Sequence, residues 1–271
     1  MSPNASWTLD PGVIIGVVTA GGAYIFRWRR VRTGRSTRRQ AEAPVWRLTC
    51  FLGALLTVLV ALVSPVDALA DQVFFVHMIQ HMLLLDVVPI LAILGFTKVI
   101  LRPVTRAVSE LERRAHALAA PAFAVLFYVA VIWGWHIPAA YDLALRHSAI
   151  HAVEHASFLL AGSLYWWHLL SPIRARMRLH GMGPVVYMAA TKLLVGALGM
   201  GLAFAPSALY PYYVHHAHFW GLSAGDDQSI AGLIMAVEQS VVMGIALVVL
   251  FVRALTESER EQQRRERYEL A

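Results

Sequence analysis

Cysteine is almost absent from this 271-residue chain, which contains only Cys50. A single thiol excludes an intrachain disulfide framework and any metal site built from several cysteines. Charge is also scarce: Asp, Glu, Lys and Arg make up 15% of the residues, against about 25% in typical globular domains. Hydrophobic residues reach 58%, a composition that predicts a polytopic membrane protein with one membrane domain.

Two kinds of motif are missing as well. The sequence has no GxxxxGK[ST] loop and no Cys-Pro-Cys segment, so nothing in it resembles a nucleotide-driven metal pump. The first ten residues carry no basic segment ahead of the first apolar run, which argues against a secretory signal.

Seven apolar runs are long enough, or nearly so, to cross the hydrocarbon core of a bilayer as helices of about 20 residues. The sequence therefore predicts an all-α fold, with a seven-span membrane domain over residues 1–252 and a charged cytoplasmic tail over 253–271. The runs lie at residues 12–28, 45–65, 73–95, 119–137, 149–169, 184–208 and 229–252.

Basic residues occur in alternate segments between these runs. Residues 27–47 hold eight of them, 96–118 hold five, 173–178 hold three and the tail after residue 252 holds five. Because basic loops stay on the cytoplasmic side of a membrane, we expect the N-terminus outside and the C-terminus in the cytoplasm. We expect the protein in a bacterial plasma membrane, with the lipid bilayer as its surroundings and no nucleic acid as a partner.

Histidines gather toward the outer side in this topology. His77 and His81 lie one turn apart in the third run, roughly 6 and 12 Å below its outer end for a rise of 1.5 Å per residue. His151 and His155 repeat that spacing where the fifth run begins. Two such pairs present imidazole nitrogens from two helix faces, as helical metal sites do. We predict a metal or haem site here, with hydrogen bonding between helices as the alternative.

Other candidate ligands lie nearby or in the outer loops. Met78 and Met82 form a second i,i+4 pair beside the histidines. Neutral His with Met particularly suits Cu(I), although Met is also common in core packing. The loop triplet of His215, His216 and His218 is more typical of a solvated loop.

Three charged residues lie inside predicted spans, where charge is costly and usually paired. Asp86 and Lys192 fall at similar depths, so we expect an ion pair between them, with separate snorkelling or neutralisation as the alternative. Glu238 lies near the middle of the last span. It is a candidate proton relay, metal ligand or helix-to-helix hydrogen bond, and we favour the last.

Five segments stand out in the third to seventh spans: HMIQHMLLL at 77–85, WHIPAAYDLAL at 135–145, HAVEHASFLLAGSLYWW at 151–167, LYPYY at 209–213 and DQSIAGLIM at 227–235. In this order they resemble the CtaG-type, seven-span cytochrome c oxidase assembly factors of bacteria. The resemblance implies a role in maturing a haem–copper oxidase, with copper handled on the outer side and oxidase subunits as partners. The motif positions are His77, His81, His136, His151, His155 and Asp227.

The chain departs from that family's pattern at two places. The family commonly continues GLIM with a Pro-Gly turn, whereas AVEQS follows here, so the seventh span should run straighter and gains Glu238. Asp86 stands where an apolar residue is expected. Both departures leave the copper pathway open.

These features predict a non-enzymatic metallochaperone that binds copper and delivers it to cytochrome c oxidase. The alternatives are a haem-binding membrane protein with bis-histidine ligation and a metal or proton transporter that uses the three intramembrane charges. A membrane metalloprotease is a further alternative, because residues 151–155 match the H-x-x-E-H order, which we take as chance. A homo-oligomer is compatible with the sequence.

Overall fold

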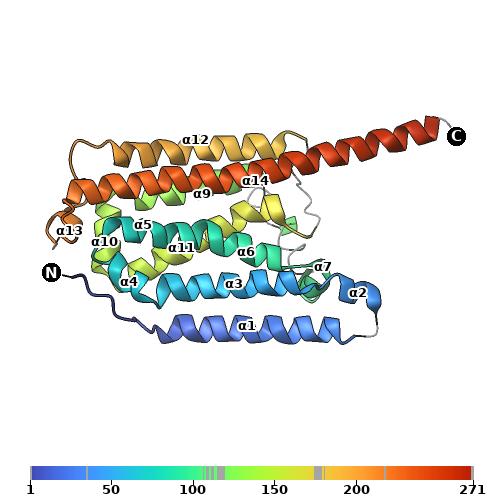
Figure 1. Cartoon of the computed structure of the whole chain (residues 1–271), viewed down its shortest axis with the longest axis horizontal. Coiled ribbons are helices and arrows are strands. Elements are labelled where there is room, and N and C mark those ends of the chain that lie inside the picture. Colours follow the sequence, from blue (N-terminus) through green and yellow to red (C-terminus); the bar gives the residue numbers. More distant parts are fainter. Residues whose placement is uncertain are drawn as a thin grey trace.

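The computed structural model describes residues 2–34, 36–105, 107, 110, 113–114, 120–173, 179, 181–216 and 218–269. Every regular element in these residues is a helix, as expected for an all-α fold, and the long helices lie side by side in one bundle (Figure 1). Some arginines that helped to predict the orientation lie outside the described residues, namely those at 35, 106, 174, 176 and 178.

The helices in chain order are α1 (Pro11–Arg32), α2 (Thr37–Ala41), α3 (Val45–Leu62), α4 (Pro65–Ala70), α5 (Phe74–Met82), the π-helical turn η1 (Leu83–Val87), α6 (Val88–Gly95), α7 (Lys98–Leu101), α9 (Pro121–Trp135), α10 (Pro138–Arg146), α11 (Ser148–Leu170), α12 (Gly183–Ala203), α13 (Pro211–Val214) and α14 (Ala224–Glu269).

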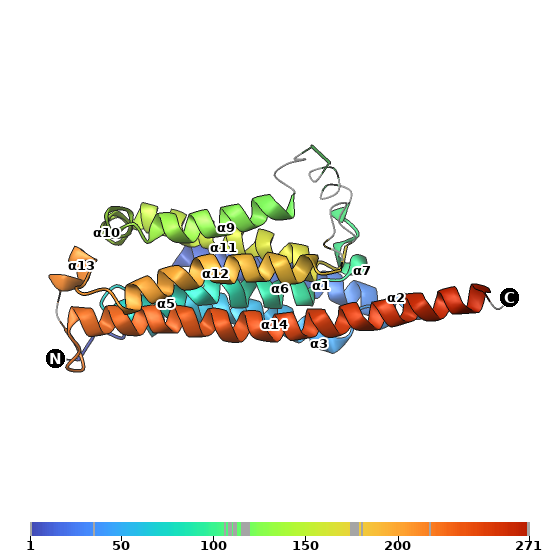
Figure 2. The same ribbon diagram turned by 90° about the horizontal axis from the view of Figure 1, so that it is seen from above.

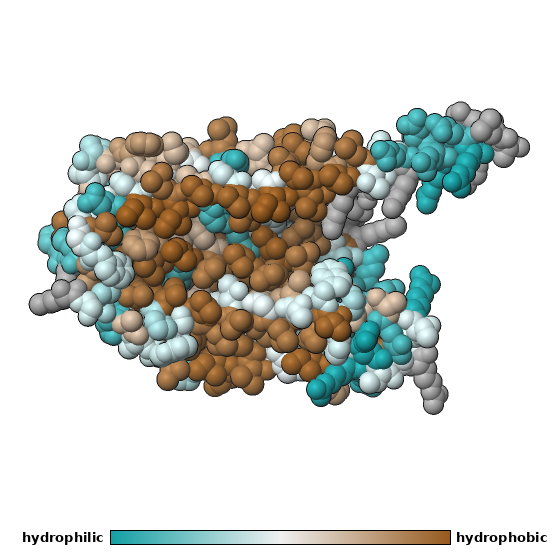
Figure 3. Space-filling view, viewed as in Figure 1, coloured by the Kyte–Doolittle hydropathy of each residue, from teal (hydrophilic) through white to brown (hydrophobic). Residues whose placement is uncertain are grey.

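Five segments among the described residues are long and apolar enough to cross a membrane: α1, α3, the continuous stretch Phe74–Gly95, α12, and α14 as far as Val252. The pair α9 and α10, bent by 73°, makes a sixth if it counts as one span. Each of the seven expected ranges contains a helix that fills most of it, so the approximate helix positions are confirmed. The ranges 45–65, 119–137 and 184–208 extend past their helices, which end at Leu62, Trp135 and Ala203. Figure 3 shows hydrophobic side chains over the middle of the bundle and hydrophilic ones at the projecting end of α14.

The π-helical turn between α5 and α6 follows from Pro89. Proline lacks the N–H that would bond the carbonyl four residues earlier, and its ring clashes with that carbonyl, which here belongs to Leu85. The N–H of Val88 accordingly bonds the carbonyl of Leu83, five residues back. On α11, a Cβ at Gly162 would stand 1.8 Å from the Leu85 carbonyl oxygen. Only a glycine therefore lets α11 lie this close to the turn.

The far end of α6 is fixed by α1 and α3. The Tyr24 hydroxyl on α1 donates to the carbonyl of Gly95 at 2.7 Å. Arg47 on α3 donates to the carbonyls of Leu94 and Phe96, both at 2.8 Å. These donors satisfy carbonyls that a helix leaves without partners at its C-terminal end, and they anchor α1 and α3 to the bundle.

The main hydrophobic core lies between the stretch α5–α6 and helices α9, α11, α12 and α14. Figure 2 shows α9 and α10 on one side of the bundle and α14 on the other, and α11 contacts both α9 and α6. The short helices α10 and α13 gather at the end where α5 begins (Figure 1). This arrangement places the first turns of α5 and α11 next to each other under α10.

Replacing Gly162 by Ala should destabilise the protein, because the new methyl group would push α11 away from Leu85. Overpacking of this kind costs about 1–3 kcal/mol, so we expect a lower thermal unfolding midpoint for the purified protein in detergent. Gly134→Ala in α9 is the matched control, since a Cβ there meets nothing within 4 Å. Equal midpoints for the two variants would refute the close approach.

Candidate metal centre

The two predicted histidine pairs meet at one level of the bundle. His77 and His81 are the fourth and eighth residues of α5, and His151 and His155 are the fourth and eighth of α11. Ring centroids lie 4.2 Å apart within each pair. Between the helices the centroids are 5.2 Å apart for His77 and His151, and 5.6 Å for His81 and His155. We call these four residues the histidine cluster.

The hydrogen bonds of His77 determine which of its nitrogens faces the cluster. Its Nδ1 lies 3.0 Å from the Tyr213 hydroxyl, which donates its proton to the carbonyl of Ala70 at 2.8 Å. A phenol has one proton to donate, so Nδ1 of His77 is the donor and its Nε2 is left unprotonated. Fixing a ligand's tautomer through its second nitrogen is typical of metal-binding histidines.

The Nε2 atoms of His77 and His81 are 2.7 Å apart, which is a hydrogen-bonding distance. Two nitrogens that each lie about 2.0–2.1 Å from one tetrahedral ion stand roughly 3.3 Å apart. The two histidines are therefore hydrogen-bonded to each other in this structure. If their Nε2 atoms moved apart by roughly half an ångström, both could bind one ion.

Glu154 is a further member of the site. It is fully buried on α11, and its Oε1 lies 3.6 Å from Nε2 of His81, while its Oε2 lies 4.0 Å from Nε2 of His151. Neither oxygen has a hydrogen-bond partner. An ionised carboxylate without partners in an apolar interior is strongly unfavourable, so its position calls for a proton or a cation.

The ligand atoms form two overlapping groups. One nitrogen each from His77, His151 and His155 lie within 4.8 Å of one another, and so do single atoms of His77, His81 and Glu154. Nε2 of His151 and Nε2 of His155 have no hydrogen-bond partner. Together the cluster and Glu154 offer nitrogen and oxygen ligands in numbers that fill the coordination shell of a transition-metal ion.

Aromatic rings close the site from two sides. The Tyr141 ring on α10 lies 5.2 Å from that of His77, and the Phe158 ring on α11 lies 4.4 Å from that of His81. Tyr141 reaches this place because the chain bends by 73° between α9 and α10, directly before Pro138. His77 and His81 are consequently inaccessible to solvent.

The predicted ligands Met78, Met82 and His136 lie beside the histidine cluster. The Met78 sulfur is 3.3 Å from Nε2 of His136, whose Nδ1 donates to the carbonyl of Ile132 at 2.7 Å. Met82 is buried in the hydrophobic core. Neighbouring residues of a helix point about 100° apart, which directs both methionines away from the face that carries the histidines.

Asp227, another predicted ligand, has a different role. Its two carboxylate oxygens accept the backbone N–H groups of Phe74 and Phe75, both at 2.8 Å. It thus caps the N-terminal end of α5 from α14 and satisfies donors that a helix leaves without partners there. Both of its oxygens hold α5, and no described group of candidate metal ligands includes Asp227. Its role as a metal ligand stays a prediction.

Asp86 lies fully buried in η1 and is held by three other helices. It accepts the hydroxyl of Tyr128 at 2.9 Å and the indole N–H of Trp166 at 2.6 Å. The side-chain amide of Gln239 donates to it at 3.3 Å and lies at the same distance from Oε2 of Glu238. Gln239 therefore links α14 to η1, and Glu238 adjoins this link, while its own role stays a prediction.

The predicted ion pair between Asp86 and Lys192 is wrong. Lys192 is exposed on the outer side of α12, whereas its neighbour Thr191 and Val195 one turn further on are buried. The orientation of α12 directs Lys192 away from the bundle interior. Tyr128 and Trp166 supply the hydrogen bonds that the lysine was expected to provide.

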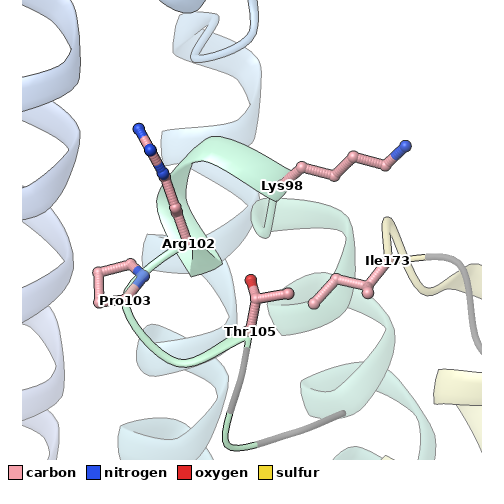
Figure 4. A pocket seen from close by; sticks show the side chains of 5 residues that line it. All are labelled: Lys98, Arg102, Pro103, Thr105 and Ile173. Atoms are coloured by element: carbon pink, nitrogen blue, oxygen red, sulfur yellow. The ribbon is translucent and has the colours of Figure 1, made fainter.

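The exposed histidines of the last loop do not join the cluster. His215 and His216 each donate from Nδ1 to a backbone carbonyl four residues earlier. A cavity of about 560 Å³ lies at the opposite end of the bundle, beside α7 (Figure 4), and no histidine is among its described lining residues. Among the described residues, the candidate metal ligands all lie in the first two or three turns of α5 and α11.

Comparison with known proteins agrees with the motifs. A family model described as the cytochrome c oxidase caa3 assembly factor matches residues 22–257. An uncharacterized protein of Mycobacterium leprae (strain TN) is 22% identical over 283 residues, which cover 97% of this chain. The chain spans 41% of the length of that relative. No solved structure matches.

Replacing Asp227 by Asn should weaken the protein without removing a metal ligand. A lost charged cap costs about 0.5–2 kcal/mol, so we expect a lower unfolding midpoint and an unchanged number of bound metal ions per chain. The midpoint and the metal content are measured on the same preparation. Asp226→Asn is the control, because Asp226 is exposed and bonds only to Ser223. A loss of bound metal in stable, folded Asp227→Asn protein would restore Asp227 as a ligand.

Proposed function

Because this chain belongs to the cytochrome c oxidase caa3 assembly factor family, we propose that it is a copper-handling assembly factor with no catalytic activity of its own. The histidine cluster would hold one copper ion and pass it to a subunit of a haem–copper oxidase by ligand exchange. The observation that carries this proposal is the pair of overlapping ligand groups, His77 with His151 and His155, and His77 with His81 and Glu154. The carboxylate of Glu154 in the second group has no hydrogen-bond partner.

A bound cation would account for the buried carboxylate and the inward-facing imidazole nitrogen of this site. Glu154 carries no hydrogen bond and the unprotonated Nε2 of His77 faces inward. Burial penalises an ionised group unless it is paired or binds a metal. A metal ion would neutralise the carboxylate and use the imidazole lone pairs at the same time.

Copper is the favoured cargo. Imidazole suits copper, zinc, iron and nickel, and divalent copper binds a given nitrogen and oxygen site more tightly than its neighbours in the first transition series. The enzyme that the family serves is a haem–copper oxidase, which needs copper. Met78 contacts His136 and does not face the cluster, so imidazoles and not thioethers would hold the ion.

The packing of the cluster disfavours two alternatives. Centroids 4.2–6.3 Å apart, with Tyr141 and Phe158 against them, leave no room for a porphyrin between the two pairs. A hydrolase would need water and a peptide to reach Glu154, which is fully buried. Both observations support an ion-holding site over haem ligation or proteolysis.

We extend the proposal to seven spans, with the N-terminus and the cluster on the outer side of a bacterial plasma membrane. This counts α11 as a span, since its 23 residues suffice in length and its polar side chains are directed inward. Val153 and Leu160, at 59% and 52% exposure, offer an apolar outer surface instead. The alternating basic segments support the orientation.

The double variant His77→Ala/His81→Ala should lose its copper. Removal of two imidazoles from one ion leaves too few ligands, and we expect copper in the purified protein to fall about tenfold or more, since even supporting residues change affinity by 10–100-fold. Elemental analysis after growth with copper measures the content, and the absorption spectrum shows whether a Soret band is present.

His215→Ala/His216→Ala is the matched control, because these two histidines are exposed and lie outside the cluster. Glu154→Gln keeps the size of the side chain and removes its charge, so it should weaken copper binding while the protein stays folded. An unchanged copper content in the His77/His81 variant would refute the proposed copper site. A Soret band in the absorption spectrum would show that the protein binds haem and not copper.

Deleting the gene should leave the partner oxidase short of copper. We expect less copper per oxidase complex and lower oxidase activity, both restored by the wild-type protein and not by the His77/His81 variant. Copper per complex is measured on purified oxidase. Excess copper in the medium should partly restore oxidase activity in the deletion strain. A fully copper-loaded oxidase in the deletion strain would contradict the proposal.

A further inference from the structure

Arginines from two distant parts of the chain line one small cavity at the end of the bundle opposite the histidine cluster. Arg27 and Arg30 come from the last turns of α1, and Arg102 follows α7. The cavity has a volume of about 180 Å³. Its remaining lining residues are Val31, Gly34, Ser36 and Val99.

The innermost of these arginines is held in place. Arg27 is half-buried and donates from Nε to the carbonyl of Ile100 at 3.4 Å and from Nη2 to the carbonyl of Val99 at 3.0 Å. Its guanidinium is therefore fixed against α7, and no hydrogen bond from its third nitrogen, Nη1, to another described residue is seen. Arg30 and Arg102 are exposed and stand at the mouth of the cavity.

None of the described residues that line this cavity is a carboxylate, and none of the ion pairs between described residues includes these arginines. Three like charges around one concavity repel one another. Guanidinium groups bind phosphate with paired N–H donors, and they do so more readily than ammonium groups. The charge and shape of the cavity therefore fit a single phosphate.

The candidate membrane span α1 ends at Arg32, within two turns of Arg27 and Arg30. In the proposed seven-span arrangement the cavity would therefore lie near the lipid headgroups. Val31 and Val99 give the cavity an apolar wall. On the other side of α7 is the larger cavity of Figure 4, where Lys98 and Arg102 extend in opposite directions from the ribbon.

We propose that Arg27, Arg30 and Arg102 bind the phosphate of an anionic phospholipid. Basic pockets between membrane helices are a known type of site for such headgroups. A lipid is favoured over free phosphate because the apolar wall and the position at the membrane surface suit a phosphate attached to acyl chains. The bound headgroup would tie α1 to α7, two elements that meet only at this end of the bundle.

The test measures lipid binding to the full chain in detergent by native mass spectrometry. The probes are phosphatidylglycerol, phosphatidylcholine with the same acyl chains, and inorganic phosphate alone. We expect phosphatidylglycerol to bind more tightly than phosphatidylcholine, and Arg30→Gln/Arg102→Gln to reduce its affinity about tenfold or more, since each arginine near an anionic lipid contributes about 1 kcal/mol.

Arg29→Gln/Arg265→Gln is the matched control, because it removes the same charge from exposed arginines that line neither cavity. Its affinity for phosphatidylglycerol should stay within about twofold of the wild type, given the weak effect of isolated surface charges. The unfolding midpoint of each variant in phosphatidylcholine shows that it is folded. Equal losses of phosphatidylglycerol affinity in both variants would refute the site and indicate a general effect of positive charge. Inorganic phosphate that binds as tightly as phosphatidylglycerol would show that the ligand is free phosphate and not a lipid.

Discussion

The contact between the Leu85 carbonyl and Gly162 sets the geometry on which the candidate site depends. Pro89 leaves that carbonyl without its α-helical partner, and the missing side chain at Gly162 lets α11 lie directly on it. With α11 held there, the first turns of α5 and α11 come to one level and their histidines face each other. A proline and a glycine far apart in the sequence thus determine where four imidazoles meet.

The same segment is fixed at two further points by α14. Asp227 caps the beginning of α5, and Gln239 reaches Asp86 in the π-helical turn. Asp86 also accepts hydrogen bonds from α9 and α11. Hydrogen bonds are stronger in an apolar interior than in water. The segment that carries His77 and His81 is therefore held at both ends by residues outside the histidine cluster.

Sequence periodicity sufficed for the helices and for the two histidine pairs, because an i,i+4 spacing by itself places two side chains on one face. Periodicity could not predict which neighbouring helix each face would contact. Lys192 had the right depth for Asp86, but the rotation of α12 about its axis directs it outward. Asp227 bonds to backbone groups more than 150 residues away. Glu154 carried a signal in the H-x-x-E-H pattern, which was set aside as chance, and only the packing of α5 on α11 shows that it faces the histidines.

Under the proposed function, the bend before Pro138 would affect the timing of metal transfer. It lays α10 across the end of the bundle, so that Tyr141 covers the imidazoles of α5. Movement of α10 would then add a barrier to the release of a bound ion, beyond the strength of the ion's bonds to nitrogen. The residence time of the ion would thus depend on α10 as well as on its ligands. A protein docking against α10 would act as the trigger for release, which confines the ion to the moment when its acceptor is present.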